Sequence, residues 1–371
     1  MRILFISRAF PPIHGGIENQ NYGISKALSE ITEVKIIANK KGKKFLPVFL
    51  PWVAIRSIFA IRKYDVVLFG DGVLSPMGVF LKIFYPKKKY ISIIHGLDIT
   101  FARNKSLLGK AYRLINIPSH KRMDKLIMVG NETIREAVKI GIPEEKCVFI
   151  PNGIDPSDIC EEHTRSELEK LTGLDLSGKK VIVRIGRYVK HKGIEWFIRK
   201  VMPGFPENYV LVAAGGVVAK KTAGDKNFFP ACQRAVEENN LGGRVKLLTN
   251  LPWRDMKILF NTADLFVSPN IIVPGSMEGF GINAVEGAAC GRVVVASRLE
   301  GLKDAIKDGE NGFLVDPGNS EAYIEKIKDL LSRDEFRKEF GKKAEKYTIQ
   351  KYRWDVIARK YVDIIEKVAE N

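Results

Sequence analysis

The segment Glu278-Gly-Phe-Gly-Ile-Asn-Ala-Val-Glu286 lies between an apolar run at residues 265–268 and a stretch at 284–290 with a helical pattern. The run predicts a buried strand, so the segment predicts a strand-to-helix turn. Gly279 and Gly281 leave little bulk in that turn, and backbone N–H groups at a helix N-terminus favour a negative ligand. The glutamates at its two ends can accept hydrogen bonds from sugar hydroxyls. The segment indicates a nucleotide sugar, although a Gly-rich turn with two surface glutamates fits the same residues.

Apolar, β-branched runs alternate with expected helices on both sides of this segment. The runs are residues 3–7, 34–38, 66–69, 90–94, 126–129 and 147–150, then 181–185, 210–213, 245–248, 265–267, 293–296 and 313–315. Such alternation is typical of a parallel sheet covered by helices on both faces, whose ligands bind at the carboxyl ends of the strands. We predict an α/β fold of two tandem, doubly wound, Rossmann-like domains with a cleft between them.

The chain length of 371 residues also fits two domains. The sequence becomes polar after Pro151-Asn-Gly-Ile-Asp155, and we place the boundary shortly afterwards, with residues 1–165 in the first domain and 166–352 in the second. Helical patterns at 321–331, 335–347 and 354–369 complete the chain. The last of them can pack on either domain.

The composition is that of a soluble globular protein, with 45% hydrophobic and 28% charged residues. The N-terminus has no signal-peptide cleavage pattern, and no uninterrupted apolar run approaches the roughly 20 residues of a membrane-spanning helix. The four scattered cysteines, Cys147, Cys160, Cys232 and Cys290, fit buried reduced thiols rather than a disulfide or zinc framework. We therefore expect a cytoplasmic protein.

The net charge of +17 is concentrated in the first half, where residues 40–125 carry 18 Lys/Arg against 4 Asp/Glu. Such a patch attracts an anionic membrane, a nucleic acid or an acidic substrate, or it is a solvated basic surface without a partner. Residues 45–62 follow a lysine cluster and form an apolar helical pattern with an interfacial Trp52, which fits a membrane surface or a buried helix equally. No nucleic-acid-binding module is recognised, so we expect no nucleic-acid partner.

A basic loop is expected at the carboxyl edge of the strand at 181–185. Gly186-Arg-Tyr-Val-Lys-His-Lys-Gly193 follows that strand directly and presents Arg187 and Lys192. Arg can bind two phosphate oxygens at once and Lys adds a point charge, so the loop suits an anionic leaving group, or it is simply a basic loop. It does not have the P-loop pattern.

Two weaker signals lie at strand ends in the first half. Gly15 and Gly16 occupy a strand-to-helix turn, where their amides can face a diphosphate. The sequence Ile94-His95-Gly-Leu-Asp98 ends another strand at the expected cleft. A histidine in such a place is more often structural, but its position at the edge favours a ligand contact.

The order of these motifs carries a family resemblance. GGIE at 15–18, HGLD at 95–98, PNGID at 151–155, GRYVKHKG at 186–193 and EGFGINAVE at 278–286 resemble the series found in retaining glycosyltransferases of the GT-B fold, family 4. NGFLVDPGN at 311–319 and the helix around Trp354 match too, so the resemblance covers essentially the whole chain. It implies sugar transfer from a nucleotide diphosphate sugar to a lipid-linked or polysaccharide acceptor, and the basic patch favours the cytoplasmic surface of a membrane.

The resemblance also implies roles for individual residues. Arg187 and Lys192 would hold the donor diphosphate, with Gly15 and Gly16 approaching it from the first domain and His95 beside the transferred sugar. The other implied donor contacts are Glu278 and the amides of Phe280, Gly281 and Ile282 for the sugar, and Glu286 for the ribose. Residues 353–371 would cross back onto the first domain.

The same resemblance implies retention of the anomeric configuration by electrostatics and positioning, without a general-base side chain. No D-x-D triplet occurs, and Arg187 with Lys192 can supply the positive charge, so neither a bound metal nor another cofactor is expected. Val129-Gly130 and Thr249-Asn250 depart from the family pattern, which leaves base recognition open. Competing interpretations are a non-catalytic sugar-nucleotide-binding protein, a nucleic-acid-binding protein, and an epimerase or phosphorylase of this fold. The nucleotide, the sugar and the oligomeric state are also open.

Overall fold

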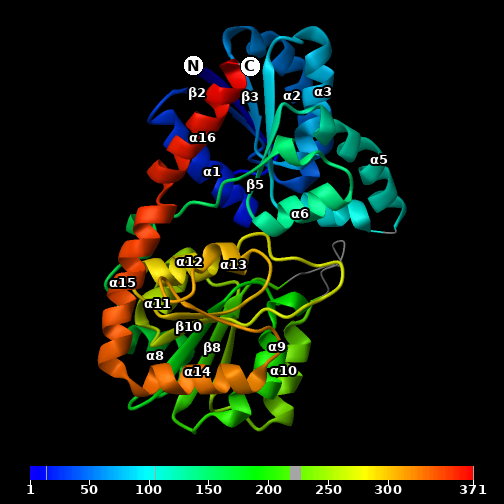
Figure 1. The fold of residues 1–371 in the computed structure, drawn as a ribbon. Helices are drawn as coiled ribbons and strands as arrows, with labels where there is room; N and C mark the ends of the chain where they lie inside the picture. The colour runs from blue at the N-terminus through cyan, green and yellow to red at the C-terminus, as the bar shows by residue number, and fades with distance from the viewer. Residues whose placement is uncertain (14, 105, 218–226, 371) are drawn as a thin grey trace. The chain divides into compact units, whose positions relative to one another are not determined.

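The computed structural model describes residues 1–13, 15–104, 106–217 and 227–370. The contacts of the chain divide it into two compact units, Met1–Gly153 with Tyr352–Asn371, and Ile154–Lys351. Each unit holds one parallel sheet of six strands with helices on both faces (Figure 1). The predicted two-domain α/β fold is confirmed.

The first sheet has the order β2-β1-β3-β4-β5-β6. The central strands are apolar and almost wholly buried, whereas the edge strand β2 alternates between exposed and covered residues. Its strands are β1 (Arg2–Ser7), β2 (Glu33–Ala38), β3 (Val66–Phe69), β4 (Lys89–Ile94), β5 (Lys125–Met128) and β6 (Cys147–Phe149).

The second sheet has the order β12-β11-β10-β7-β8-β9. Its residues pack with the covering helices into a core that is separate from that of the first sheet. Its strands are β7 (Lys180–Ile185), β8 (Tyr209–Gly215), β9 (Val245–Thr249), β10 (Leu265–Ser268), β11 (Val294–Ser297) and β12 (Phe313–Val315). All twelve strands lie within two residues of the runs predicted from the sequence.

Helices connect the strands in both units. Those of the first unit are α1 (Gly16–Ser29), α2 (Leu46–Ala60), α3 (Ser75–Phe84), α4 (Leu97–Thr100), α5 (Leu107–Arg122), α6 (Asn131–Lys139) and α16 (Trp354–Glu370). Those of the second are α7 (Pro156–Ile159), α8 (Arg165–Thr172), α9 (Ile194–Lys200), α10 (Phe229–Glu238), α11 (Trp253–Thr262), α12 (Ile282–Ala289), α13 (Leu302–Ala305), α14 (Ser320–Ser332) and α15 (Asp334–Tyr352).

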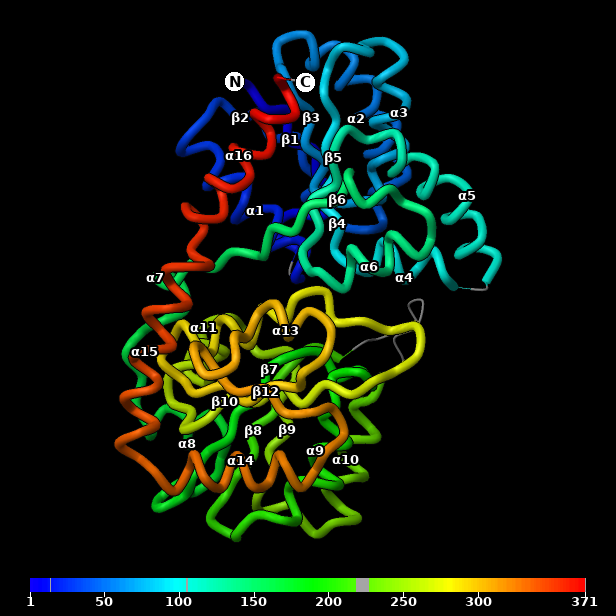
Figure 2. The backbone as a smooth tube through the Cα atoms, viewed as in Figure 1, coloured from blue at the N-terminus to red at the C-terminus, as the bar shows by residue number. Residues whose placement is uncertain are grey.

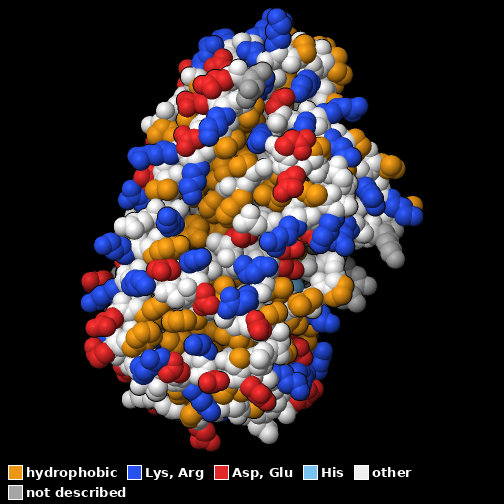
Figure 3. Space-filling model, in the orientation of Figure 1, with side chains coloured by type: hydrophobic (Ala, Val, Ile, Leu, Met, Phe, Trp, Pro, Cys, Tyr) orange, Lys and Arg blue, Asp and Glu red, His pale blue; other side chains and the backbone are white. Residues whose placement is uncertain are grey.

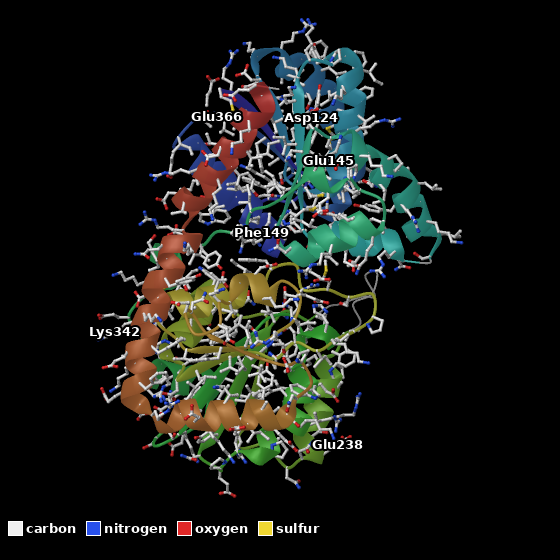
Figure 4. The ribbon with its side chains drawn as sticks, in the orientation of Figure 1. Asp124, Glu145, Phe149, Glu238, Lys342 and Glu366 are labelled. Atoms are coloured by element: carbon white, nitrogen blue, oxygen red, sulfur yellow. The ribbon has the colours of Figure 1, made fainter. Side chains whose placement is uncertain are left out.

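Polar side chains fasten helices to the sheets. Asp124, labelled in Figure 4, precedes β5 and accepts hydrogen bonds from Lys82 Nζ on α3 (2.9 Å) and from the backbone N–H of Tyr90 on β4 (2.7 Å). In the second unit, Glu238 at the end of α10 forms an ion pair with Arg199 on α9. The first contact holds α3 and β4 to the start of β5, and the second holds α9 to α10.

Each sheet reverses its winding direction at one point. In the first unit the reversal lies between β1 and β3, which are neighbours in the sheet. In the second unit it lies between β7 and β10. In doubly wound sheets, ligands bind outside the carboxyl ends of the strands at such a point. The segments that follow these four strands are therefore the expected ligand-binding segments.

By its contacts the chain divides after Gly153, whereas the boundary predicted from the sequence lies at residue 165. The short helix α7 packs beside α12 in the second unit. Cys160 places its Sγ atom 2.6 Å from that of Cys290 at the end of α12. Residues 154–165 look like a polar linker in sequence, but these contacts attach them to the second unit.

The terminal helix α16 belongs to the first unit, where it lies beside α1 (Figure 2). Its first residue, Trp354, has its indole against the backbone of Gly23 on α1 and of Gly153. Side chains at either glycine would overlap the indole ring, so close backbone approach holds the helix in place.

The helix α2 is apolar on two sides. Phe49, Val53 and Ser57 are buried against the first unit, whereas Val48, Trp52, Ile55 and Phe59 are exposed. By length and composition alone, the helical stretch Lys43–Lys63 is the one described segment that could cross a membrane. Core helices also satisfy that criterion, so the finding is weak support for a span. The expectation from the sequence concerned uninterrupted apolar runs, and this stretch is interrupted by Arg56 and Arg62.

Candidate active site

The loop after β7 is fixed at its base and exposed at its tip. Tyr188 is buried, and its hydroxyl donates to the carbonyl of Ala213 (2.7 Å) and lies 3.0 Å from that of Leu248. Arg187 beside it is exposed. A 3₁₀ turn over Lys190–Lys192 then directs the chain into α9. The sequence thus places two basic residues on a loop that the sheet holds rigidly.

Lys192 and Glu278 form an ion pair at the carboxyl edges of β7 and β10. Only 15% of the Lys192 side chain and 12% of the Glu278 side chain are exposed. Asn270, just after β10, donates its side-chain N–H to the same carboxylate oxygen of Glu278 at 3.0 Å. The sequence assigned Lys192 to a phosphate and Glu278 to a sugar, and the structure brings the two side chains together.

The surroundings of this pair keep Glu278 ionised. Burial alone would raise its pKa, but the charges of Lys192 and His191 and the hydrogen bonds from Lys192 and Asn270 lower the pKa of Glu278 to about 2. Burial lowers the pKa of Lys192 more than Glu278 raises it. Glu278 is therefore an acceptor of hydrogen bonds at neutral pH and cannot donate a proton.

The turn from Glu278 into α12 takes the predicted form. The backbone N–H of Glu278 donates to a carboxylate oxygen of Glu300 (2.6 Å), and its carbonyl accepts from Gly301 N–H (3.2 Å). Gly281 caps the helix with φ of +90°, and a Cβ there would lie 2.6 Å from Leu302 Cδ2. A glycine is thus required both for the backbone conformation and for the packing.

The first amides of α12 are available to a ligand. Phe280 is buried, and the backbone N–H groups of Gly281 and Ile282 donate to no acceptor among the described residues. Such groups at a helix N-terminus attract negative charge. They follow Glu278 directly in the chain, as the sequence predicts.

Glu286 lies on the second turn of α12 and is half-buried. Burial, together with the negative charge of Asp158 on α7, raises the pKa of Glu286 to about 7. The two glutamates that bracket the segment therefore differ, since Glu278 is firmly ionised and Glu286 titrates near neutral pH.

The remaining predicted residues lie in the first unit. Gly15 caps α1 and its carbonyl accepts from Asn19 N–H at 3.0 Å, while Gly16 begins the helix and is exposed. His95 follows β4, and its Nε2 atom lies 2.9 Å from the carbonyl oxygen of Gly70. Its backbone N–H donates to Asp98 Oδ2 at 3.0 Å. The imidazole is thus oriented by the segment after β3.

The sequence reasoning missed an ion pair beside His95. Arg8, directly after β1, donates from Nε to Asp71 Oδ1 at 2.9 Å, and Asp71 follows β3. Asp71 is fully buried, and its Oδ2 atom has no hydrogen-bond partner among the described residues. Burial raises the pKa of Asp71, with Asp98 adding to the shift and Arg8 opposing it. Both residues adjoin the reversal point of the first sheet.

Three further residues of the second unit were missed, namely Asn270, Glu300 and Arg184. Asn270 and Glu300 become neighbours of Glu278 only through tertiary packing. Arg184 did carry a signal, since it is the one charged residue inside the otherwise apolar run Val181–Ile185. Among the described residues no group of three or more His, Cys, Asp or Glu side chains is placed to hold a metal ion.

Comparison of the sequence with known proteins finds similarity to glycosyltransferases. The model described as Glycosyltransferase Family 4 matches residues 14–158, and the model described as Glycosyl transferases group 1 matches residues 171–347. The chain is 29% identical over its full length to 99% of an uncharacterized glycosyltransferase of Methanocaldococcus jannaschii. Over 74% of its length it is 27% identical to 68% of the N,N'-diacetylbacillosaminyl-diphospho-undecaprenol alpha-1,3-N-acetylgalactosaminyltransferase of Campylobacter jejuni.

Solved structures agree on the fold. An Anabaena protein in complex with UDP-glucose superposes with a TM-score of 0.77 at 19% identity, covering 99% of this chain and all of the other. The homologues are glycosyltransferases of the GT-B type. Together these findings support glycosyltransferase activity with a nucleotide-sugar donor.

Proposed function

We propose that the chain is a retaining, metal-independent glycosyltransferase that moves a sugar from a nucleotide diphosphate sugar to a lipid-linked or glycan acceptor at the cytoplasmic face of a membrane. The observation that carries the proposal is the Lys192–Glu278 pair at the carboxyl edge of the second sheet. It sits where doubly wound sheets bind ligands and beside the open amides of α12.

The charges at this edge suit the parts of a nucleotide sugar. Arg187 and Lys192 would hold the diphosphate and stabilise the negative charge that develops on it as the sugar departs. Glu278 would accept hydrogen bonds from sugar hydroxyls, because it stays ionised at neutral pH. The amides of Phe280, Gly281 and Ile282 would add donors, and Glu286 would accept from the ribose.

The reaction needs no general-base side chain in this scheme. The acceptor hydroxyl attacks the anomeric carbon from the face of the leaving group, and the bond from that carbon to the diphosphate oxygen breaks. A phosphate oxygen takes the proton of the acceptor hydroxyl. The protein supplies positioning and positive charge.

Donor use can be tested without knowing the acceptor. UDP-, GDP- and ADP-sugars are screened for thermal stabilisation, since a tight ligand raises the melting temperature by mass action. The sugar nucleotide that stabilises is then tested for slow hydrolysis to the nucleoside diphosphate. We expect turnover by the wild type and none by Arg187→Ala. Stabilisation without any turnover or transfer would favour a non-catalytic binding protein.

Retention and metal independence have separate tests. The released sugar is followed by proton NMR before mutarotation, and retention predicts the anomer of the donor. Inversion would contradict the proposed stereochemistry. Activity in EDTA should equal activity in added Mg²⁺, because the positive charge comes from Arg187 and Lys192, and a strict need for added metal would contradict this.

The membrane assignment rests on the first unit. Val48, Trp52, Ile55 and Phe59 recur every three or four residues, so they form one exposed apolar stripe along α2. The stripe follows a cluster of exposed lysines, Lys40, Lys41, Lys43 and Lys44. An apolar stripe with basic residues at its end suits the surface of an anionic bilayer.

Helix α5, which packs against α3, has the same character. Leu107, Leu108, Leu114 and Ile115 are exposed, with Lys110 and Arg113 between them. Apolar and basic side chains lie together over α5 on the face shown in Figure 3. The Campylobacter relative is named for a diphospho-undecaprenol acceptor, which supports a lipid-linked acceptor here.

Vesicle binding tests this part independently of catalysis. Sedimentation with phosphatidylglycerol vesicles at low salt should retain the wild type and release a variant with Lys40, Lys41, Lys43 and Lys44 changed to Gln. The matched control changes four exposed lysines on α15, Lys338, Lys342, Lys343 and Lys346, to Gln and should leave binding intact. Absence of wild-type binding, or equal loss in both variants, would remove the membrane from the proposal.

A further inference from the structure

Arg184 is a buried cation with unused hydrogen-bond donors. It is the fifth of the six residues of β7, close to the carboxyl end of the strand, and only 2% of the residue is exposed. Its Nη2 atom donates to the carbonyl of Lys192 at 3.3 Å, but Nε and Nη1 have no partner among the described residues. The guanidinium lies against Gly186, where any Cβ would overlap it. The Arg184 guanidinium therefore contacts the loop at both Gly186 and Lys192.

Such an arrangement is costly in the ligand-free protein. A buried charged group that leaves donors unsatisfied loses the hydration it had in the unfolded chain. Burial lowers the pKa of Arg184 to about 10, so the side chain still carries its charge at neutral pH. The ligand-free fold alone does not account for a charged Arg at this position.

The neighbouring ion pair has one carboxylate for two cations. Lys192 is bonded to Glu278, while Arg184 feels the charge of Glu278 and repels Lys192. The three side chains carry a net charge of +1 together. Glu300 is a second carboxylate nearby, and its Oε2 atom accepts from the backbone N–H of Glu278 at 2.6 Å.

Donor binding would disturb this balance. The proposed function draws the Lys192 ammonium to a phosphate oxygen. Glu278 would then keep only neutral donors, such as the Asn270 amide and sugar hydroxyls, although 88% of its side chain is shielded from solvent. An unpaired carboxylate in such surroundings is strongly destabilising. The charge of His191 would remain nearby, but its Nδ1 atom lies 2.7 Å from Ser276 Oγ, so another cation is needed to replace the direct contact of Lys192.

We propose that Arg184 is a positioning residue that becomes the counter-ion of Glu278 when Lys192 moves to the donor diphosphate. Its unsatisfied Nε and Nη1 groups are the donors that this exchange uses. The carboxylate thus stays ionised and correctly placed for the sugar, while Lys192 is free to neutralise phosphate. The inference rests on the proposed function, and it explains why the strand before the loop carries a buried Arg.

A double-mutant cycle tests the exchange with UDP, UDP-glucose, GDP-mannose and ADP-glucose as probes. Arg184→Met fills the same volume without charge. We expect it to weaken binding of the probe that the wild type recognises by roughly thirtyfold, because one partner of a buried charge pair is lost. In the background of Glu278→Gln, which has no carboxylate to compensate, Arg184→Met should change affinity by less than about twofold. Arg184→Lys should restore part of the affinity.

Stability distinguishes this role from a structural one. The melting temperature of ligand-free Arg184→Met should equal or exceed that of the wild type, because unsatisfied buried donors are removed. The matched control is Arg244→Met. Arg244 donates to the carbonyls of Tyr209, Phe205 and Pro206, so its loss should lower the melting temperature and leave probe affinity unchanged.

The outcomes separate the two proposals. If the wild type binds a probe and Arg184→Met loses the same factor in both backgrounds, or loses nothing, the counter-ion role is wrong while the proposed function stands. A melting temperature of Arg184→Met that falls with that of Arg244→Met also overturns it. If the wild type binds none of the probes, the proposed function fails and the exchange fails with it.

Discussion

Each unit has a buried carboxylate at the reversal point of its sheet, but the surroundings shift the pKa values of the two carboxylates in opposite directions. In the first unit Asp71 follows β3 and pairs with Arg8 from the segment after β1. In the second, Glu278 follows β10 and pairs with Lys192 from the loop after β7. Burial and the like charge of Asp98 raise the pKa of Asp71, whereas compensating groups lower the pKa of Glu278 to about 2.

The difference lies in the balance of charge around each carboxylate. Asp71 pairs with Arg8 and feels the charge of His95, but Asp98 adds a like charge, and Asp71 Oδ2 has no hydrogen-bond partner among the described residues. Glu278 has Lys192, Asn270 and the nearby charges of His191 and Arg184, which is more than a single carboxylate needs. An ion pair is present in both units, but only the surroundings of Glu278 hold an excess of positive charge, which suits a diphosphate ligand.

The largest expected effect is on catalysis in the second unit. Lys192→Met should reduce the rate of nucleoside diphosphate release by about 10²- to 10³-fold, the usual cost of removing one group that stabilises developing charge. Lys190→Met, an exposed lysine on the same loop, is the matched control and should stay within about twofold. Steady-state kinetics with the preferred donor measure both. Equal losses would mean that general basicity of the loop matters, and not Lys192.

In the first unit the largest effect should be on stability. Asp71→Asn breaks the pair with Arg8 and should lower the free energy of unfolding by about 3 kcal/mol, since a largely buried partner is left unpaired. Asp65→Asn, whose pair with Arg2 is exposed, should cost less than about 0.5 kcal/mol. Urea unfolding measures the two values. Similar small losses would show that the Asp71 pair does not hold the strand ends.

The pH dependence of nucleotide affinity tests Glu286. Its folded pKa of about 7 lies above the ordinary value of 4.5, so ionisation in the folded protein is delayed to neutral pH. The ionised form is the better acceptor for ribose hydroxyls, and affinity should rise by up to about tenfold between pH 6 and pH 8. Titration calorimetry measures this rise, and Glu286→Gln should abolish it. Tenfold is the upper limit, because the Glu286 side chain is only partly buried and solvent weakens the effect of its charge.

The same pKa has a consequence for stability. A raised carboxyl pKa stabilises the fold fully below 4.5, and this contribution is lost as pH rises through about 7. The ligand-free protein should therefore lose stability over that window relative to Glu286→Gln. An identical pH profile for the two proteins would contradict the assignment.

The smallest expected effect comes from Asp158, whose side chain is 58% exposed. Asp158→Asn removes the negative charge that raises the pKa of Glu286, so nucleotide affinity at pH 6 should rise by about twofold, the modest size typical of an exposed charge. At pH 8, where Glu286 is already ionised, affinity should not change. A loss of affinity at pH 6 would show that Asp158 acts by another route.

The strands and the loops that follow β7 and β10 were predictable because their signals are local. Apolar runs bounded by Gly and Pro located all twelve strands, and the positions of Lys192 and Gly281 followed from the strands before them. The sequence also located the stripe at residues 45–62, although only the structure decides which of its faces is buried.

What escaped prediction depends on packing between distant segments. Arg8 and Asp71 are 63 residues apart, and Lys192 and Glu278 are 86 residues apart, so neither pairing is visible in the chain. The raised pKa of Glu286 depends on burial and on the charge of Asp158, which is far from Glu286 in the sequence. The boundary moved to Gly153 for the same reason, since α7 is attached by contacts that its polar neighbours in sequence conceal.

Hydrogen–deuterium exchange with and without the preferred nucleotide sugar tests the central claim, that the donor site is the carboxyl edge of the second sheet. We predict that the donor slows exchange of the amides in two segments, residues 187–193 and 278–286, and that Lys192→Met removes this protection. Protection confined to other parts of the chain, or donor binding that leaves both segments unchanged, would contradict the account.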